Sequence, residues 1–342
     1  MSVAVESRKP LRMVVCRGCG AKIFIPGDLA PLSTTGCSKC GHELMMPMQL
    51  RQFELRAPIA SGGMGTVYRS FDVNLEREVA VKLMKRELKE DPQALESFYR
   101  EARAAAALNH SNIIHIYTFD EFDSQLYLVM ELADAGSLDN RIEREKRVAE
   151  LDILDNGIKV ATGLASAQKR NLLHRDIKPG NILFNEEGEP KLIDFGLARK
   201  AEGSNDDETT IWGTPYYIAP EKVKREREDF LSDMYSLAGT LYHAITGCVP
   251  FEAPTVEAVV AAHIHTPLTP PNHVAPDISQ PTSDALARAM GKHPTERFQS
   301  YDEFIMALEA ARSQLLVSQL RSQGTVSTTG GPARAAKTWW RR

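Results

Sequence analysis

The segment from Leu172 to Lys200, LLHRDIKPGNILFNEEGEPKLIDFGLARK, sets charged and amide side chains among short apolar runs. Asp176, Asn181 and Asp194 provide oxygen atoms, which are the ligands that a hard divalent cation prefers. Lys178 follows the first Asp by two residues, so its ammonium group would hold an anion nearby. This combination indicates a phosphate-transfer site. The alternative is a salt-bridged core, which is costly because each buried carboxylate needs a partner.

A second set of chemically suited residues is the pair of CxxC motifs, CRGCG and CSKCG, with 17 residues between them. This spacing matches a closed, tetrahedral structural zinc site with no open position for catalysis. The first fifty residues have too little core to fold alone, so the metal would supply folding energy. Four unpaired thiols in a flexible tail are the alternative, and His42 is a rival ligand. The module resembles a zinc ribbon, and its expected ligands are Cys16, Cys19, Cys37 and Cys40.

The composition is that of a soluble globular protein of 342 residues with a net charge of -4. This charge gives no general reason to expect nucleic-acid or membrane binding. The sequence has no apolar run of about 18 residues, so we expect no transmembrane segment. The first residues lack the apolar core of a signal peptide. Four of the five cysteines lie in CxxC pairs, which indicates metal binding in a reducing, cytoplasmic compartment.

The elements that must position these residues divide into a sheet-rich part and a helix-rich part. Short strands are expected at 53–61, 66–71 and 78–83, followed by a helix at 94–109 and strands at 113–119 and 126–132. From about residue 136 the pattern is mainly helical, with short strands at NILF and KLI. The sequence therefore predicts an α+β fold in two lobes. The expected domains are a zinc-ribbon-like module at 1–50, a globular domain at 53–313 and a flexible basic tail at 314–342.

The glycine-rich stretch SGGMGTVYRS lies between two strand patterns. It does not open a helix, as a dinucleotide fingerprint must, and it lacks the Gly-Lys-Ser/Thr end of a Walker A loop. Its glycines could instead let a hairpin lie close over phosphates, where backbone N–H groups reach oxygens. Lys82 follows, alone among apolar residues, and needs an anionic partner such as Glu101. A purely structural ion pair between these two residues is the alternative.

Six motifs in order resemble those of a eukaryotic-type (Hanks-type) Ser/Thr protein kinase of the bacterial branch. They are GGMGTVY, VAVK, HRDIKPGN, DFG, GTPYYIAPE and DMYSLAGTLYHAITG, and the resemblance covers about 260 residues. It implies a β-rich N-lobe and an α-rich C-lobe. It also implies transfer of the γ-phosphoryl group of ATP to protein Ser/Thr hydroxyls with the help of Mg²⁺.

The resemblance assigns a role to each chemical group. Asp176 would be the catalytic base, Lys178 would neutralise the moving phosphoryl group, and Asn181 and Asp194 would hold magnesium. Lys82 would contact the α- and β-phosphates and pair with Glu101. The residues implied to contact the nucleotide are Ile59, Ala60, Ser61, Gly62, Gly63, Met64, Gly65, Thr66 and Val67 of the hairpin, and Glu131 to Ala133 of the hinge.

The resemblance also implies supporting contacts. Met130 resembles the gatekeeper, and His174 and Arg175 would support the catalytic loop. Asp233 would brace that loop from a central helix. A buried ion pair between Glu221 and Arg297 would shape the substrate lobe. One departure is Ala60, where the family usually has glycine, and we expect slightly altered ATP affinity from it.

Other functions remain open from the sequence. One is a pseudokinase-type signalling scaffold, another a small-molecule kinase of the aminoglycoside type, and a third a nucleic-acid-binding ribbon that recruits the kinase. The expected partners are protein substrates and a protein partner of the ribbon. We expect activating phosphorylation at Thr209 or Thr210, and at Ser204 with less support, with the phosphate pairing with Arg175. The basic tail with its two Trp residues has the composition of a membrane border, and weak surface association is a minor alternative.

Overall fold

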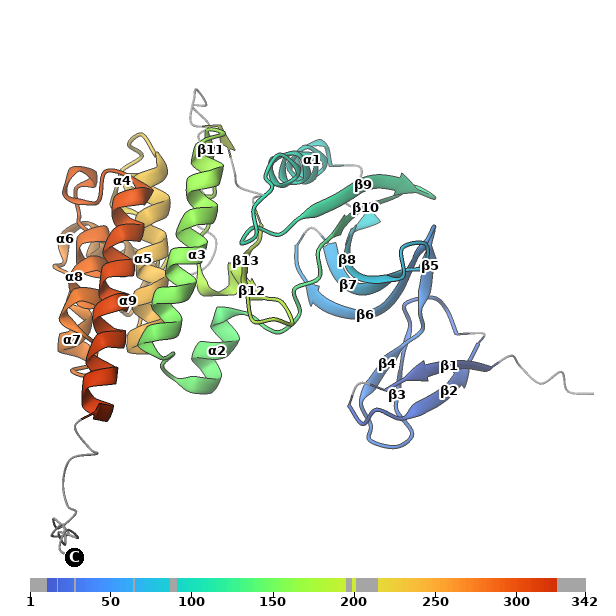
Figure 1. The fold of residues 1–342 in the computed structure, drawn as a ribbon. Coiled ribbons are helices and arrows are strands. Elements are labelled where there is room, and N and C mark those ends of the chain that lie inside the picture. Colours follow the sequence, from blue (N-terminus) through green and yellow to red (C-terminus); the bar gives the residue numbers. More distant parts are fainter. Residues whose placement is uncertain are drawn as a thin grey trace, which may run out of the picture.

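The computed structural model describes residues 11–16, 18–27, 29–63, 65–86, 91–194, 199–200 and 215–324. A small N-terminal module precedes a curled β-sheet lobe, which leads into a helical lobe (Figure 1). This confirms the predicted two-lobed α+β architecture. Within the described ranges, no helix combines the length and the hydrophobicity that crossing a bilayer requires.

The N-terminal module consists of two short antiparallel hairpins. β1 pairs with β2, and β3 pairs with β4, so that each hairpin carries one CxxC knuckle beside it. Its small core contains Cys16, Cys37, Ile23, Ile25 and Leu44. The bounds are β1 Leu11–Val15, β2 Lys22–Pro26, β3 Thr34–Gly36 and β4 Glu43–Met45.

The N-lobe is one antiparallel six-stranded sheet in the order β5-β6-β7-β8-β10-β9. Alternating apolar side chains from its strands form one core cluster, which includes Leu55, Val79, Val81 and Tyr127. The helix α1 (Pro92–Ala106) contributes Leu95 to a second cluster on the sheet. The strand bounds are β5 Met48–Leu50, β6 Phe53–Ser61, β7 Gly65–Asp72, β8 Arg77–Met84, β9 Ile116–Phe122 and β10 Gln125–Met130.

The first strand of this sheet, β5, lies within the range 1–50 that the sequence assigned to the ribbon-like module. It pairs with β6, with Leu50 opposite Phe53, and Leu50 is fully buried. Met45 from the ribbon hairpin belongs to the same N-lobe core cluster. The ribbon is therefore joined to the N-lobe by β5, which follows the ribbon hairpins in the chain and pairs in the N-lobe sheet, and by a shared core.

The C-lobe packs its helices around one large apolar cluster. The helices α3, α5 and α9 run side by side through it (Figure 1), and nearly every side chain of α5 is buried. The bounds of its elements are α2 Leu138–Glu145, α3 Glu150–Gln168, β11 Leu172–Leu173, η2 Pro179–Asn181, β12 Ile182–Phe184, β13 Pro190–Leu192, β14 Arg199–Lys200, α4 Pro220–Val223, α5 Phe230–Thr246, α6 Val256–His265, α7 Pro271–Val274, α8 Gln280–Ala289, η4 Pro294–Glu296 and α9 Tyr301–Gly324.

The last helix, α9, continues to Gly324, whereas composition placed the start of a flexible tail at 314. The segment QLLVSQLRSQ contains strong helix formers, and Leu315 packs on the C-lobe core. The predicted tail rested on the Ser, Thr, Gly and Ala content of the stretch SQGTVSTTGGPARAAK, whereas α9 continues into the first residues of that stretch.

Candidate active site

The catalytic loop, residues 174–178, follows β11 and is fastened to the first turn of α5. The two carboxylate oxygens of Asp233 accept the backbone N–H groups of His174 at 2.7 Å and Arg175 at 2.8 Å. His174 is fully buried, and its Nε2 lies 2.8 Å from the carbonyl of Ile193. The predicted brace is therefore present. It holds Arg175 at φ 68, a conformation that a non-glycine residue keeps only when its surroundings enforce it.

Asp176 is held by two donors on the same oxygen. Lys178 Nζ donates to Asp176 Oδ2 at 2.7 Å, and Asn181 Nδ2 donates to the same atom at 3.0 Å. Asn181 also donates to the main-chain carbonyl of Asp176 at 2.7 Å. Among the described residues, Asp176 Oδ1 has no hydrogen-bond partner. One oxygen is thus fixed, and the other is left to accept a proton.

The pKa of the Asp176 carboxyl is lowered. Burial acts to raise this pKa, but the hydrogen bond and the charge of Lys178 outweigh it. The carboxylate is therefore ionised at neutral pH and can only accept hydrogen bonds. This is the protonation state that a general base requires.

Asp194 and Asn181 meet at the open end of a short hairpin. β12 pairs with β13, and the backbone N–H of Ile193 donates to the carbonyl of Asn181 at 3.0 Å. Asp194 follows at φ 62 with half of its side chain exposed. Its Oδ1 lies 3.9 Å from Lys82 Nζ. The structure therefore brings together the two predicted magnesium ligands and the predicted phosphate-binding lysine, which come from three separate motifs.

The Glu101 side chain and Met64 lie outside the described residues, and so does the stretch 201–214 with Ser204, Thr209 and Thr210. The pairing of Lys82 with Glu101 stays a prediction.

The glycine-rich hairpin joins β6 to β7. Gly62 N–H donates to Gly65 O at 2.9 Å, and the hydroxyls of Ser61 and Thr66 lie 2.7 Å apart across its base. A Cβ at Gly62 or Gly63 would meet no atom within 4 Å, whereas one at Gly65 would meet the Leu83 carbonyl at 2.0 Å. Gly65 is thus required for strand packing, and the two tip glycines lie in open space. The predicted nucleotide-contacting residues on the two strands, Ile59, Ala60, Ser61, Thr66 and Val67, flank this tip.

The hinge follows β10. Glu131 N–H donates to the carbonyl of His115 at 2.8 Å, and the Glu131 carboxylate forms an ion pair with Lys191. Ala133 is buried, and its backbone N–H and carbonyl make no hydrogen bond among the described residues. Buried backbone groups need partners. A ligand with a planar donor and acceptor edge would supply them.

One group of charged residues near the hinge was not predicted. Arg69 on β7 forms ion pairs with Glu78 at 2.6 Å, with Asp134 of the hinge at 3.1 Å and with Glu186 of the β12–β13 turn at 3.4 Å. The pairs connect the N-lobe, the hinge and the C-lobe. Arg69 and Glu186 are 117 positions apart, and no local pattern in the sequence signals their contact.

The substrate lobe contains the predicted buried ion pair. Arg297 Nη1 and Nη2 each donate to one oxygen of Glu221 at 2.7 Å. The next residue, Lys222, donates to the carbonyl of Arg175 at 2.8 Å and so links this pair to the catalytic loop. Arg175 Nε also lies 3.7 Å from a carboxylate oxygen of Glu228.

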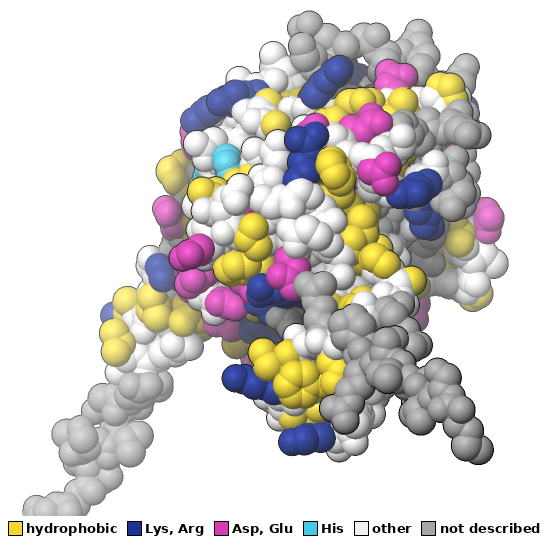
Figure 2. Space-filling model, turned by 90° about the vertical axis from the view of Figure 1, so that its right-hand side faces the viewer, with side chains coloured by type: hydrophobic (Ala, Val, Ile, Leu, Met, Phe, Trp, Pro, Cys, Tyr) yellow, Lys and Arg dark blue, Asp and Glu magenta, His cyan; other side chains and the backbone are white. Residues whose placement is uncertain are grey.

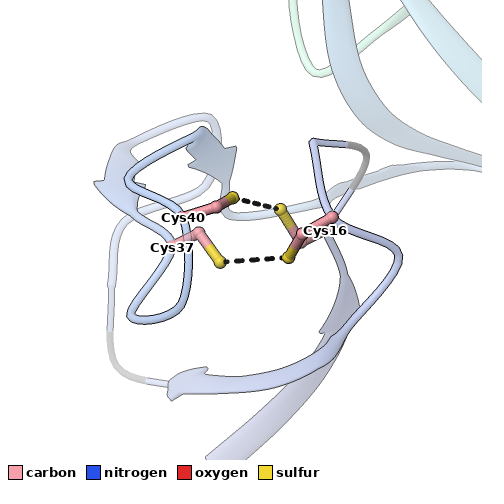
Figure 3. A group of neighbouring side chains, drawn as sticks. Cys16, Cys37 and Cys40 are labelled. Carbon is pink, nitrogen blue, oxygen red and sulfur yellow. Dashed lines mark hydrogen bonds between the residues drawn. The ribbon is translucent and has the colours of Figure 1, made fainter.

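The four cysteines of the ribbon form two equivalent knuckles. The Sγ atoms of Cys16 and Cys40 are 3.5 Å apart, and those of Cys19 and Cys37 are 3.9 Å apart (Figure 3). A tetrahedral zinc ion with bonds of about 2.3 Å to sulfur requires edges of about 3.8 Å. Lys39 N–H donates to Cys37 Sγ, and this hydrogen bond acts to lower the pKa of the Cys37 thiol, whereas the neighbouring thiols raise the pKa of Cys40. The residues present therefore fit a zinc ion.

The backbone of each knuckle repeats the same pattern. Gly20 N–H donates to Cys16 O and Gly41 N–H donates to Cys37 O, and both glycines have positive φ, at 70° and 75°. Only glycine adopts this conformation without cost. His42, the rival ligand, packs against Gly18 and is not part of the metal-ligand group.

The two lobes, the hinge and the catalytic loop between them define a protein kinase. Comparison with known families agrees, since residues 53–327 match the family described as "Protein kinase domain". The chain belongs to this family, and a protein kinase domain implies ATP and Mg²⁺.

Several curated relatives are similar to the chain. A probable serine/threonine-protein kinase of Clostridium perfringens, CPE1738, is 35% identical over 259 residues, which are 75% of this chain and 38% of the relative. The serine/threonine-protein kinase PknA of Mycobacterium tuberculosis is 34% identical over 293 residues, which are 83% of this chain and 65% of the relative. The chain spans less than two thirds of the length of these relatives.

Proposed function

We propose that this chain is an ATP-dependent protein kinase that transfers the γ-phosphoryl group to Ser and Thr hydroxyls of proteins. The observation that carries the proposal is the hydrogen bonding of the Asp176 carboxylate. Its Oδ2 accepts hydrogen bonds from Lys178 and Asn181, while its Oδ1 has no partner among the described residues. A fixed, ionised carboxylate with one available oxygen is suited to accept the proton of an incoming hydroxyl.

The reaction divides between these groups. The substrate oxygen forms a bond to the γ-phosphorus, its proton passes to Asp176 Oδ1, and the bond to the β-phosphate oxygen breaks to release ADP. Lys178 stands 2.7 Å from Asp176 and would balance the charge of the group in transit. Lys82 would hold the α- and β-phosphates. Asn181 and Asp194 would hold Mg²⁺, which supplies charge neutralisation on the phosphates when it is bound.

The backbone and the hairpin would position the nucleotide. The N–H and carbonyl of Ala133, which have no hydrogen-bond partner in the described part of the chain, would bind the adenine edge, and the hairpin from Ile59 to Val67 would cover the phosphates. The choice of Ser and Thr over Tyr rests on Lys178 in the catalytic loop and on the relatives, whose names describe serine/threonine kinases.

Regulation and the ribbon complete the proposal. Autophosphorylation at Thr209 or Thr210 would give Arg175 an anionic partner. Arg175 already lies near one anion, because its Nε is 3.7 Å from a carboxylate oxygen of Glu228. Zinc at the four cysteines would give the ribbon its fold. The ribbon would serve as a structural or partner-binding module, with a protein as one candidate partner. The free cysteines of the structure suit the reducing cytoplasm.

The test is phosphate transfer from labelled ATP with Mg²⁺, followed by phosphoamino-acid analysis. Asp176→Asn removes the base and keeps its size, so we expect a loss of at least about 100-fold in rate with unchanged thermal unfolding. Asp302→Asn, on the exposed side of α9, is the matched control and should keep full activity. Transfer by the Asp176 variant at the wild-type rate, or a wild type that binds ATP and transfers nothing, would overturn the proposal. The second result would favour a pseudokinase scaffold.

A further inference from the structure

Lys191 on β13 is a cation in a place where charge is costly. Only 8% of this residue is exposed, and its neighbours in the strand, Pro190 and Leu192, are buried as well. β13 lies at the junction of the two lobes, between the C-lobe helices and the N-lobe sheet (Figure 1). A buried ammonium group needs an anionic partner, so the partner of Lys191 is bound more firmly than a partner at the surface.

Many charged side chains of the molecule lie in a different environment. Figure 2 shows Lys, Arg, Asp and Glu side chains interspersed over one face of the molecule, where water reaches them. Lys159 and Glu189 form an ion pair of this exposed kind at 2.8 Å, with side chains that are 38% and 44% exposed. Water competes for both groups in such a pair, so the pair fixes neither of them. Because Glu189 belongs to the β12–β13 turn, this pair is a suitable reference for Lys191.

The partner of Lys191 is the hinge residue Glu131. Lys191 Nζ forms an ion pair with Glu131 Oε1, and the two side chains are 10% and 20% exposed. The nearby ring of His110 carries no charge at neutral pH, because burial and then the charge of Lys191 lower its pKa. Within the part of the chain that the structure describes, Glu131 is the one carboxylate paired with Lys191. The cation therefore ties the hinge to β13.

The remaining polar atoms of Glu131 hold one neighbouring residue. Its Oε2 accepts the backbone N–H of His115 at 3.3 Å, and its own backbone N–H donates to the His115 carbonyl at 2.8 Å. Both carboxylate oxygens and the backbone N–H of Glu131 are thus engaged. The ion pair and these two hydrogen bonds together set the orientation of the Glu131 backbone.

The segment before His115 is fixed to β13 as well. Leu192 N–H donates to the carbonyl of Asn112 at 2.9 Å, and Ile114 N–H donates to the carbonyl of Leu192 at 3.0 Å, so the segment runs parallel beside β13. The contacts form a closed ring, in which β13 holds this segment, the segment holds the hinge, and the ion pair connects the hinge to β13 again. The side chain of Lys191 closes this ring.

The hinge atoms that remain available are backbone groups. The carbonyl of Glu131 and the N–H and carbonyl of Ala133 make no hydrogen bond to any described residue. An adenine ring offers an amino donor and ring-nitrogen acceptors, which match these groups. Hydrogen bonds weaken steeply when donor and acceptor are misaligned. The affinity for the base therefore depends on the orientation of the hinge backbone, which the closed ring of contacts restricts.

We propose that Lys191 is a positioning residue for the adenine base, and that its ion pair with Glu131 holds the hinge backbone in the orientation that binds the base. This inference rests on the proposed kinase function, because it concerns the nucleotide site of that function. Lys191 acts through Glu131 and has no part in phosphoryl transfer itself. A role in ordering the magnesium ligand Asp194, three residues further along the chain, is the alternative, and it affects different ligands.

The test is calorimetric titration of the full-length chain with adenosine, which has no phosphate, and with ADP and Mg²⁺. In Lys191→Met we expect the Kd of both ligands to rise about 10-fold, the effect of losing one hydrogen bond. The KM for ATP should rise by the same factor, whereas kcat should change less than about 2-fold, because Asp176 keeps its contacts. The matched control is Lys159→Met, which loses only an exposed ion pair and should bind both ligands like the wild type.

Two further variants separate positioning from stability. Lys191→Arg keeps the cation and should recover most of the affinity for adenosine. Glu131→Gln should weaken adenosine binding several-fold, and Lys191→Met added to it should weaken binding no further, because the two residues act as one unit. Thermal unfolding reports whether each variant is folded. If Lys191→Met does not fold, an unchanged adenosine Kd in Glu131→Gln overturns the proposal in its place.

The outcomes divide clearly. An unchanged adenosine Kd in a folded Lys191→Met protein would overturn the proposal, even if the melting temperature falls, since the role would then be structural. A loss of affinity confined to ADP with Mg²⁺ would also overturn it and would place the effect at Asp194. A wild type that binds adenosine and transfers no phosphate would contradict the kinase proposal alone, because the effect of Lys191 on adenosine binding would still be measured.

Discussion

The ion pair between Arg297 and Glu221 offers the sharpest test of how the substrate lobe is held together. Arg297 is 1% exposed, and its guanidinium group makes two 2.7 Å hydrogen bonds to the carboxylate. It also donates to the carbonyls of Leu231 at 2.8 Å and Gly291 at 2.9 Å. The perturbation is Arg297→Met, which keeps much of the volume and removes all of these donors.

The expected loss of unfolding free energy follows from the buried groups that the substitution leaves without a partner. Glu221 would stay buried with Ser232, at 2.6 Å, as its one remaining side-chain donor among the described residues, and two carbonyls would lose a donor. Breaking a buried pair on one side costs about 3–5 kcal/mol. A protein of this size loses about 2–4 °C of melting temperature per kcal/mol, so the melting temperature should fall by about 6–20 °C.

The pH dependence of stability gives a second, independent test, because it should have opposite directions in the wild type and the variant. Burial raises the pKa of Glu221, but the hydrogen bonds and charge of Arg297 outweigh it and lower the pKa overall. The stability from the pair is therefore complete above the unfolded pKa of about 4.3 and is lost as the pH falls through the lower folded value. Without Arg297, burial alone raises the folded pKa, so the variant loses stability as the pH rises above 4.3. The difference between the two proteins should thus widen from pH 5 to pH 8.

Thermal unfolding of the variant over this pH range is the assay. Glu221→Gln in the Arg297→Met background removes the stranded charge and should recover part of the loss. Arg144→Met is the control, because Arg144 makes a 2.6 Å bond to Glu145 but is 67% exposed, and exposed pairs contribute about 0–1 kcal/mol. A fall of less than about 3 °C, or one that equals the control, would refute the reasoning.

Three further outcomes can be checked together. Gly65→Ala should raise the KM for ATP and lower the melting temperature, because the added Cβ would meet a backbone carbonyl at 2.0 Å. Gly63→Ala places its Cβ in open space and should change the free energy of unfolding by no more than about 0.5 kcal/mol. Arg69→Met, which breaks the link between lobes and hinge, should raise the KM for ATP several-fold, while Arg56→Met, whose ion pairs stay within the N-lobe, should leave it unchanged. Cys16→Ser should reduce bound zinc from one per chain to none and raise amide exchange within residues 11–50 without affecting the C-lobe, as metal analysis and exchange mass spectrometry would show.

The elements and the ion pairs differ in how far the sequence predicts them. The hairpin strands from β6 to β8 carry alternating apolar residues, and the CxxC spacing specifies the knuckles, so both were predictable from local patterns. Asp233 and Arg297 were assigned by resemblance to a family, and the structure contains the predicted contacts. Spacing alone could not have paired Arg297 with Glu221, because 76 positions separate them.

The unpredicted features arise from tertiary packing. Arg69 is one charged residue on a strand whose outward positions are normally polar, so nothing marks it as a bridge between lobes. The join between ribbon and N-lobe depends on β5, which is only three residues long, below the length at which periodicity is informative. In both cases the deciding information is which distant segment lies opposite, and a local pattern does not contain it.

The structural ion pair of the substrate lobe and the charged residues of the catalytic site differ in burial and in the distance between their partners. This difference suits their separate functions. The Glu221–Arg297 pair is bidentate and almost wholly buried, with side-chain exposures of 3% and 0%. In contrast, Asp194 is 50% exposed and lies 3.9 Å from Lys82, and Lys178 is 46% exposed. A dry bidentate pair resists exchange of partners, whereas a loose, hydrated pair yields when a phosphate arrives. The fixed pair can therefore hold the loop, through Lys222 and Arg175, while the reactive groups remain available to the substrate.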